Sequence, residues 1–250
     1  MKHDIVDDEY GTGLVLPQLR AFSPDAPVAE LAAEYARTGA IRIGGLFTAD
    51  RIARIRAELD VHMTQVVPTL TRDVHYEADG SVRVANELQR YSGYFEEVLG
   101  DPAMLRLVAD VTGWKPVPFY AEYFVKRPLG SVANPHQDSA FEHLEPHQYL
   151  HAWIALDDIT ADMGPLRLWL GSNRHGVFPH DERDFGGFKF ISREVVAGFG
   201  FDVATGVAAA GDAFLLDTAL VHASTRNVSD RPRPSLALAY RGANAVHVNA

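Results

Sequence analysis

The sequence predicts an α+β protein with a mainly β core, in which helices pack on an antiparallel sheet or barrel. Two observations predict this class: segments with helical periodicity occupy residues 28–113, and apolar runs of strand length occupy residues 117–242. With 250 residues, 47% of them hydrophobic and 22% charged, the chain has the composition of a globular protein that buries a sizeable core. No internal repeat, low-complexity tract or linker divides it, so we expect a single domain over residues 1–250.

Three helices are expected in the first part of the chain. Residues 28–37 place their apolar side chains on one helical stripe, and Thr48 is suited to cap a second helix whose Ile55 faces inward. A third helix is expected to begin at Pro102, because proline suits the first helical position, and to end near Gly113.

Strands are expected to follow, because the apolar runs are short and are bounded by Pro, Gly, Asp and Asn. Between them lies a long segment rich in glycine and charge, residues 176–200, which is typical of a lid or binding loop. The five runs that we predict to form strands are residues 117–126, 148–156, 165–171, 211–224 and 235–242.

The charge balance and the absence of cysteine exclude several classes of protein. Lys and Arg number 23 against 33 Asp and Glu, a net charge of −10 that argues against a nucleic-acid or anionic-membrane partner. Without cysteine there is no disulfide, thiolate nucleophile, iron–sulfur cluster or cysteine zinc site. The first ten residues contain no apolar signal region and no run is long enough to span a bilayer, so we expect a cytoplasmic protein.

Residues 134–138 contain the most informative pattern, a histidine and an aspartate two positions apart. In a strand His136 and Asp138 project from the same face, and His222, at the end of an apolar run, is suited to supply a third metal ligand. Two imidazoles and one carboxylate on one face of a metal form the site of non-haem Fe(II) oxygenases, which leaves positions for a bidentate cosubstrate and O2. Because His-x-Asp also occurs in ordinary surface turns, the interpretation depends on its surroundings.

A possible cosubstrate site follows His222 in the sequence. A dicarboxylate such as 2-oxoglutarate requires a cation at its far end, and a planar guanidinium offers bidentate hydrogen bonds there. Arg231 and Arg233 are both available, with the hydroxyl of Ser224 as a further donor. Since the two arginines are two residues apart, strand alternation places them on the same face and does not choose between them.

The combined pattern of His136-x-Asp138 and His222-x-Ser224, with Arg233 eleven residues after His222, resembles the phytanoyl-CoA dioxygenase family of Fe(II)/2-oxoglutarate-dependent oxygenases. The resemblance extends in the family's order from about Arg37 to Arg241. Three further segments are similar to elements of the family, namely residues 37–48, residues 151–158, and residues 164–166 together with 171–176.

The resemblance implies a double-stranded β-helix (a jelly-roll or cupin-like core) with the N-terminal helices packed on it. It implies that Fe(II) is held by His136, Asp138 and His222, and that 2-oxoglutarate and O2 are the cosubstrates. The family spacing favours Arg233, with Ser224, as the anchor of the C5 carboxylate. The implied reaction is hydroxylation of an unactivated C–H bond with release of succinate and CO2. Halogenating members carry a small residue at the ligand carboxylate, so Asp138 favours oxygenation.

The substrate is less well defined by the sequence. No apolar stretch suggests an acyl tunnel, so we expect a small metabolite such as an amino acid or a natural-product intermediate. Two alternatives stay open: a cupin-like metalloenzyme without 2-oxoglutarate, and desaturation or epoxidation by the same chemistry. His151 is expected to be a partly buried histidine or a pocket residue rather than a ligand. Further residues expected at the pocket are Lys126 for the cosubstrate or substrate, and Trp153, Asn86, Arg90 and Phe178 for the substrate.

Overall fold

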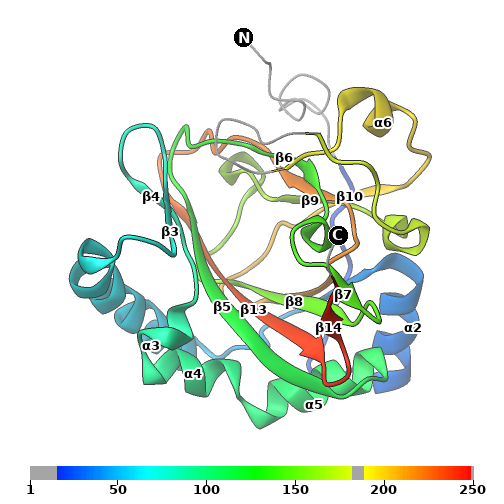
Figure 1. Ribbon diagram of the computed structural model, residues 1–250, viewed down its shortest axis with the longest axis horizontal. Coiled ribbons are helices and arrows are strands. Elements are labelled where there is room, and N and C mark those ends of the chain that lie inside the picture. The colour runs from blue at the N-terminus through cyan, green and yellow to red at the C-terminus, as the bar shows by residue number, and fades with distance from the viewer. Residues whose placement is uncertain (1–15, 182–188, 249–250) are drawn as a thin grey trace.

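The computed structural model describes residues 16–181 and 189–248 of the chain. Its described residues form an eight-stranded sheet, a four-stranded sheet and a separate two-stranded ribbon. In Figure 1 the helices α2 to α5 lie on one side of the larger sheet and the strands of the smaller sheet lie on the other. The larger sheet is therefore the middle layer, and its inner face is turned towards the smaller sheet.

The strands pair in an order that is far from their order along the chain, as expected for a sheet with crossovers. The larger sheet runs β1 (Ala21–Phe22), β2 (Ala40–Ile43), β11 (Ala213–Asp217), β8 (Tyr149–Ala155), β13 (Arg233–Gly242), β5 (Pro116–Lys126), β4 (Val82–Ala85) and β3 (Val74–Tyr76). The smaller sheet runs β10 (Val203–Thr205), β9 (Leu166–Trp169), β12 (His222–Ser224) and β6 (Ala133–His136), and the ribbon pairs β14 (Val246–His247) with β7 (Leu144–Glu145).

The three predicted helices are confirmed, together with the local signals that delimit them. The Thr48 side chain accepts a hydrogen bond from the backbone N–H of Arg51, and Asp101 caps the helix that follows it. Within the described residues no helix is long and apolar enough to cross a membrane. The helices are α2 (Val28–Thr38), α3 (Ala49–Val61), α4 (Gly93–Leu99), α5 (Pro102–Thr112) and α6 (Arg193–Ala197).

One predicted strand is corrected by the structure. The apolar run at 211–224 forms two strands, β11 and β12, and they belong to different sheets. A tight turn separates them, in which the N–H of Leu220 binds the carbonyl of Asp217 and the N–H of Ala219 binds its carboxylate. This turn carries the chain from the larger sheet to the smaller one, immediately before His222.

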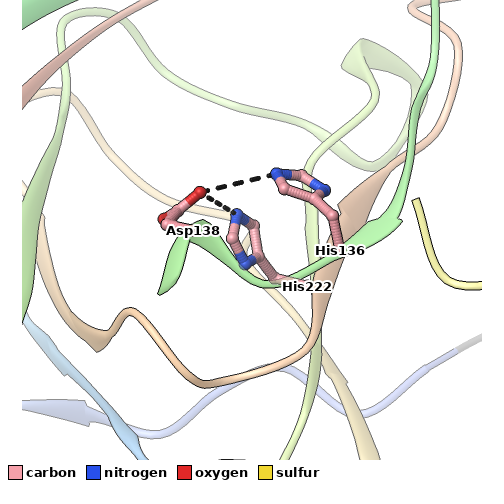
Figure 2. Close-up of side chains that lie close together, drawn as sticks. All are labelled: His136, Asp138 and His222. Atoms are coloured by element: carbon pink, nitrogen blue, oxygen red, sulfur yellow. Dashed lines mark ion pairs between the residues drawn. The ribbon is translucent and has the colours of Figure 1, made fainter. Parts of the chain in front are cut away.

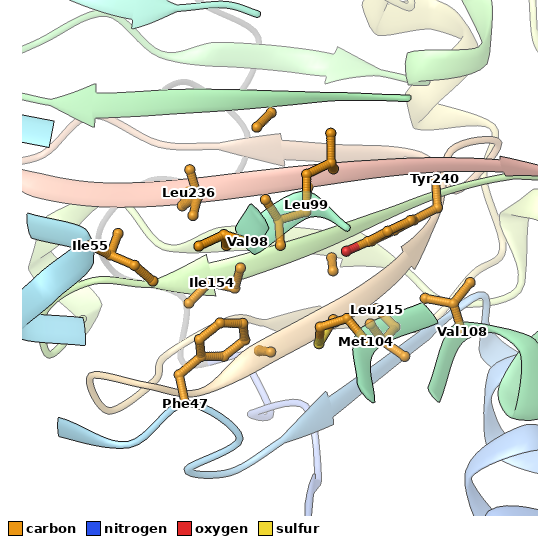
Figure 3. Packing of buried hydrophobic residues seen from close by; sticks show 14 of the residues in the cluster. Phe47, Ile55, Val98, Leu99, Met104, Val108, Ile154, Leu215, Leu236 and Tyr240 are labelled. Atoms are coloured by element: carbon orange, nitrogen blue, oxygen red, sulfur yellow. The ribbon is translucent and has the colours of Figure 1, made fainter. Parts of the chain in front are cut away.

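The two faces of the larger sheet have different partners. Figure 3 shows Ile154, Leu215, Leu236 and Tyr240 pointing from the strands into the helical layer, where residues such as Met104 meet them. Because side chains alternate along a strand, the neighbouring residues of the same strands face the smaller sheet. The outer face thus supplies the main core, which leaves part of the inner face available for polar side chains.

Candidate active site

The two predicted histidine ligands lie directly opposite each other on paired strands. His222 at the start of β12 is in antiparallel register with His136 at the end of β6. Gln137 has an extended backbone (φ −126°, ψ 129°), so Asp138, which begins a short 3₁₀ helix, projects to the same side as His136. Figure 2 shows its carboxylate facing both rings, with Oδ1 3.6 Å from Nε2 of His136 and 3.7 Å from Nε2 of His222. One potential ligand atom from each residue lies within 4.8 Å of the others, which is compact enough for a single metal ion.

The backbone selects the tautomer of both histidines. Nδ1 of His136 lies 2.7 Å from the carbonyl of Asn134, and Nδ1 of His222 lies 3.1 Å from the carbonyl of Leu220. A carbonyl oxygen only accepts hydrogen bonds, so each Nδ1 is the donor. The lone pair of each Nε2 is therefore turned towards Asp138, as metal-ligating histidines require.

The protonation states at this group also suit a metal ion. Burial, reinforced by the neighbouring His222, lowers the pKa of His136 to about 3. Burial acts to raise the pKa of Asp138, but the imidazoles of His222, His151 and His136 outweigh it and hold that pKa well below its usual range. At neutral pH the site thus combines a neutral imidazole with a charged carboxylate, which are the ligating forms of both groups.

His151 approaches the same carboxylate from β8. Its Nδ1 lies 3.1 Å from Oδ2 of Asp138, and its Nε2 lies 3.0 Å from the hydroxyl of Tyr149 and 3.2 Å from that of Tyr120. The two tyrosine hydroxyls also contact each other. His151 is thus a pocket residue, as predicted, and it holds Oδ2 so that Oδ1 is turned towards the two histidines.

A cavity of about 610 Å³ extends from this group along the inner face of the larger sheet. At one end Arg233 and Lys126 are cross-strand neighbours on β13 and β5, and their side chains are buried (5% and 8% exposed). The ammonium of Lys126 donates to the carbonyls of Ser224 (3.3 Å) and Thr225 (2.6 Å). Two buried cations therefore lie at one end of the cavity, and one of them is bound to the strand that begins with His222.

Arg233 has hydrogen-bonding capacity that the described residues do not use. Its Nε and Nη1 atoms are buried without a hydrogen-bond partner, and its guanidinium lies 5.3 Å from the centre of the Trp153 ring. Burial lowers the pKa of Arg233 to about 10, so the group is charged at neutral pH. Such a buried cation is unfavourable unless an anion binds it, and Ser224, buried and lining the same cavity, offers a hydroxyl nearby. This end of the cavity fits a carboxylate, including the far carboxylate of 2-oxoglutarate.

The structure distinguishes Arg233 from Arg231, which strand alternation alone places on the same face. Arg231 is exposed and does not line the cavity. It precedes β13 in a turn, where its carbonyl accepts a hydrogen bond from Nδ2 of Asn227 (2.6 Å). Arg233 is the first residue of β13, and the strand directs its side chain inward.

The residues predicted for the substrate are divided between two places. Trp153, Asn86 and Arg90 line the cavity. Phe178 does not line it, because its ring packs in a separate apolar cluster with Phe199 and Phe201. The prediction for Phe178 is corrected accordingly.

Five acidic residues that the sequence analysis did not single out also line the cavity. One of them, Glu122, lies on β5 between Tyr120 and Lys126, and all three side chains line the cavity. The alternation of the run at 117–126 was the signal that could have identified it. The five residues are Asp73, Glu77, Glu87, Glu122 and Glu142.

A second residue missed by the sequence analysis is Gln137, which lies between the two predicted ligands of the first motif. Its fully buried side-chain amide donates to the carbonyls of Gly176 (2.8 Å) and Ala219 (2.5 Å) and accepts from the N–H of Phe178 (2.7 Å). Gln137 thereby joins the loop after β9 to the turn that precedes His222. It is a positioning residue for both halves of the metal group.

We expect Gln137→Ala to lower the free energy of unfolding by about 3 kcal/mol, because it leaves two carbonyls and one N–H without buried partners. Urea denaturation measures the change. The exposed Gln65 provides a matched control, and Gln65→Ala is expected to alter stability by no more than about 0.5 kcal/mol. Equal stability of the two variants would show that the bonds of Gln137 do not hold these loops.

Comparison with known proteins assigns the chain to a family. The model of the family described as phytanoyl-CoA dioxygenase (PhyH) matches residues 35–235. A phytanoyl-CoA dioxygenase domain-containing protein 1 homolog of Dictyostelium discoideum is 31% identical over 128 residues, which are 49% of this chain and 46%, less than half, of that protein. The ectoine dioxygenase of Stutzerimonas stutzeri (strain A1501) is 26% identical over 240 residues, covering 86% of this chain and 78% of that protein.

Solved structures agree in fold at low sequence identity. The α-ketoglutarate-dependent epimerase SnoN from nogalamycin biosynthesis has a TM-score of 0.72 at 20% identity, covering 89% of this chain and 85% of that one. EctD from S. alaskensis, solved with 2-oxoglutarate and 5-hydroxyectoine, has a TM-score of 0.72 at 19% identity, covering 92% and 83%. The predicted double-stranded β-helix with N-terminal helices is therefore confirmed. The chain belongs to the phytanoyl-CoA dioxygenase family, whose members are Fe(II)/2-oxoglutarate-dependent oxygenases.

Proposed function

We propose that the protein is a hydroxylase that uses Fe(II), 2-oxoglutarate and O2 to oxidise an unactivated C–H bond of a small metabolite. One observation carries the proposal: a single cavity holds the His136–Asp138–His222 group and, at its end, a buried arginine with two unpartnered nitrogens. A metalloenzyme that does not use 2-oxoglutarate has no need of this arginine. The unpartnered guanidinium therefore favours the 2-oxoglutarate-dependent reaction over the metal-only alternative.

The residues of the site have distinct proposed roles, some in binding the metal and others in binding 2-oxoglutarate. His136, Asp138 and His222 would hold Fe(II) on one face and leave the opposite positions open to ligands. Arg233 and Ser224 would bind the C5 carboxylate of 2-oxoglutarate, which directs the oxo-acid end of the cosubstrate towards the metal group. Lys126 would keep Ser224 in place through the two carbonyls that it binds.

Oxidation of 2-oxoglutarate supplies two of the four electrons that reduce O2, and oxidation of the substrate supplies the other two. Fe(II) supplies the activation of O2, one oxygen atom of which enters succinate while the other enters the product as a hydroxyl group. The two-electron oxidation of the C–H bond and the oxidative loss of CO2 from 2-oxoglutarate together reduce one O2. The protein contributes by orienting both substrates in a cavity of about 610 Å³, a volume suited to a small molecule.

Anaerobic titration of the metal-free protein, first with Fe(II) and then with 2-oxoglutarate, tests the proposal. A visible charge-transfer band on addition of 2-oxoglutarate is expected, because a bidentate 2-oxo acid on Fe(II) absorbs there. The protein with both His136 and Asp138 replaced by alanine is the control and should give no band. If Fe(II) binds the unmodified protein and no band develops, the 2-oxoglutarate-dependent function is rejected in favour of the metal-only alternative.

A further inference from the structure

Charged side chains line the active-site cavity along its length. Arg233 and Lys126 lie at the end that fits the far carboxylate of 2-oxoglutarate. Besides Asp138, five carboxylates line the cavity wall, and Arg83, Arg90 and Lys189 line it as well; the five are those of Asp73, Glu77, Glu87, Glu122 and Glu142. A ligand that occupies the rest of the cavity therefore meets acidic groups.

Glu122 is placed to reach such a ligand. It lies four residues before Lys126 on β5 and faces the same side of the strand, so the two backbone positions are about 13 Å apart. Its cross-strand neighbour on β13 is Ala237, and the residue beyond Ala237 on β8 is Trp153. The small side chain of Ala237 leaves room over the sheet between Glu122 and the indole, both of which line the cavity.

The five carboxylates differ in their partners. Asp73 accepts a hydrogen bond from the hydroxyl of Tyr91 (2.6 Å), and Glu77 accepts one from the hydroxyl of Ser131 (2.5 Å). Glu87 is paired with Arg90 (3.0 Å), and Glu142 is 3.5 Å from Nδ1 of His247. Among the described residues Glu122 has neither an ion pair nor a hydrogen bond to its carboxylate. His151, whose charge acts on Glu122, already binds Asp138.

Among the described residues no cation is bound to the Glu122 carboxylate, and a further hydrogen-bond acceptor lines the same cavity. Burial raises the pKa of Glu122 to about 7, against the opposing effect of His151, which is the behaviour of a carboxylate that has lost water without gaining a cation. Asn86 lines the same cavity, and its side-chain oxygen is buried without a hydrogen-bond partner. A ligand with several N–H donors and a positive charge satisfies both groups.

We propose that the primary substrate is a small molecule that carries a protonated amine, amidinium or guanidinium group, and that Glu122 binds this group beside the iron site. The inference rests on the proposed function, because it takes the other end of the cavity to hold 2-oxoglutarate. Glu122 is then a specificity-determining residue: it selects the cationic molecule and fixes which carbon faces the metal group.

Paramagnetic broadening of proton resonances by Fe(II), measured anaerobically on the protein loaded with Fe(II) and 2-oxoglutarate, tests the inference. The probes are two pairs that differ in charge and little in shape: butylguanidine with butylurea, and N-acetyl-L-lysine amide with N-acetyl-L-norleucine amide. We expect at least one cation to bind about tenfold more tightly than its neutral partner, since loss of a charged hydrogen bond typically has an effect of this size.

The matched variants are Glu122→Gln, which removes the charge and keeps the shape, and Glu97→Gln on the exposed surface of α4. The preference for the cation should disappear in Glu122→Gln and persist in Glu97→Gln. Equal binding within each pair, no binding of any probe, or a preference unchanged in Glu122→Gln would overturn the inference, provided that the resonances of 2-oxoglutarate are broadened. If those resonances are not broadened, the proposed function itself fails.

Discussion

Replacement of Asp138 by alanine is expected to lower the affinity for Fe(II) at least ~100-fold and to abolish succinate formation. Partners of the ligands typically contribute 10–100-fold to metal affinity, and Asp138 is both the sole carboxylate of the group and the acceptor of His151. The variant leaves only two imidazoles, and imidazole nitrogen holds a hard divalent cation more weakly than a charged oxygen does. Equilibrium dialysis of Fe(II) and assay of succinate measure the two effects.

The control for this prediction is Asp110→Ala, which removes one carboxylate from the exposed surface of α5. It should bind Fe(II) as the unmodified protein does, so that a general change of charge is separated from loss of a ligand. A second comparison is His151→Phe, which keeps the three predicted ligands and removes the bond to Oδ2. We expect the Fe(II) affinity of His151→Phe to lie between those of Asp138→Ala and Asp110→Ala, about 10-fold below that of the unmodified protein. Undiminished Fe(II) binding by Asp138→Ala would exclude Asp138 as a ligand.

The larger features of the fold were predictable because their signals are local. A capping threonine, a proline in a first helical turn and apolar runs of strand length are each read from a few neighbouring residues, and α2, α3, α5 and the long strands β5, β8 and β13 follow them. The helix α4 was not predicted, since seven residues are too few to display helical periodicity. The sequence predicts a single strand at 211–224, because the turn within it contains apolar residues in place of glycine or proline.

The site was predictable where spacing alone sets the geometry. His136 and Asp138 lie on one side because an extended residue separates them. The position of His222 depends on the pairing of β12 with β6, which the sequence indicates only through the place of His222 at the end of an apolar run and through the family resemblance. Other roles depend on tertiary neighbours. Gln137 is important because of the two loops it joins, and Glu122 because a small alanine lies beside it, neither of which the sequence states.

Replacement of Arg233 by alanine is expected to weaken binding of 2-oxoglutarate about 100-fold, because removing one partner of a buried charge pair leaves the other without compensation. Arg233→Lys retains the charge but not the planar pair of donors, so its affinity for 2-oxoglutarate should fall about 10-fold. Arg231→Ala is the control, since it removes the same charge from an exposed position that does not line the cavity. The dissociation constant of 2-oxoglutarate, measured by anaerobic titration of the Fe(II) protein, distinguishes the three variants.

The free energy of unfolding provides an independent test of the role of Arg233. Without a ligand Arg233 is a buried cation with two unpartnered nitrogens, so Arg233→Met, which is similar in length and uncharged, should raise the free energy of unfolding by about 1–2 kcal/mol. In the unmodified protein 2-oxoglutarate should raise the melting temperature, because it binds the folded state alone, and in Arg233→Met this increase should be lost. A variant that is more stable by itself and insensitive to 2-oxoglutarate identifies an arginine retained for binding. A variant that is less stable under both conditions would instead assign Arg233 to the structure of the β13 strand.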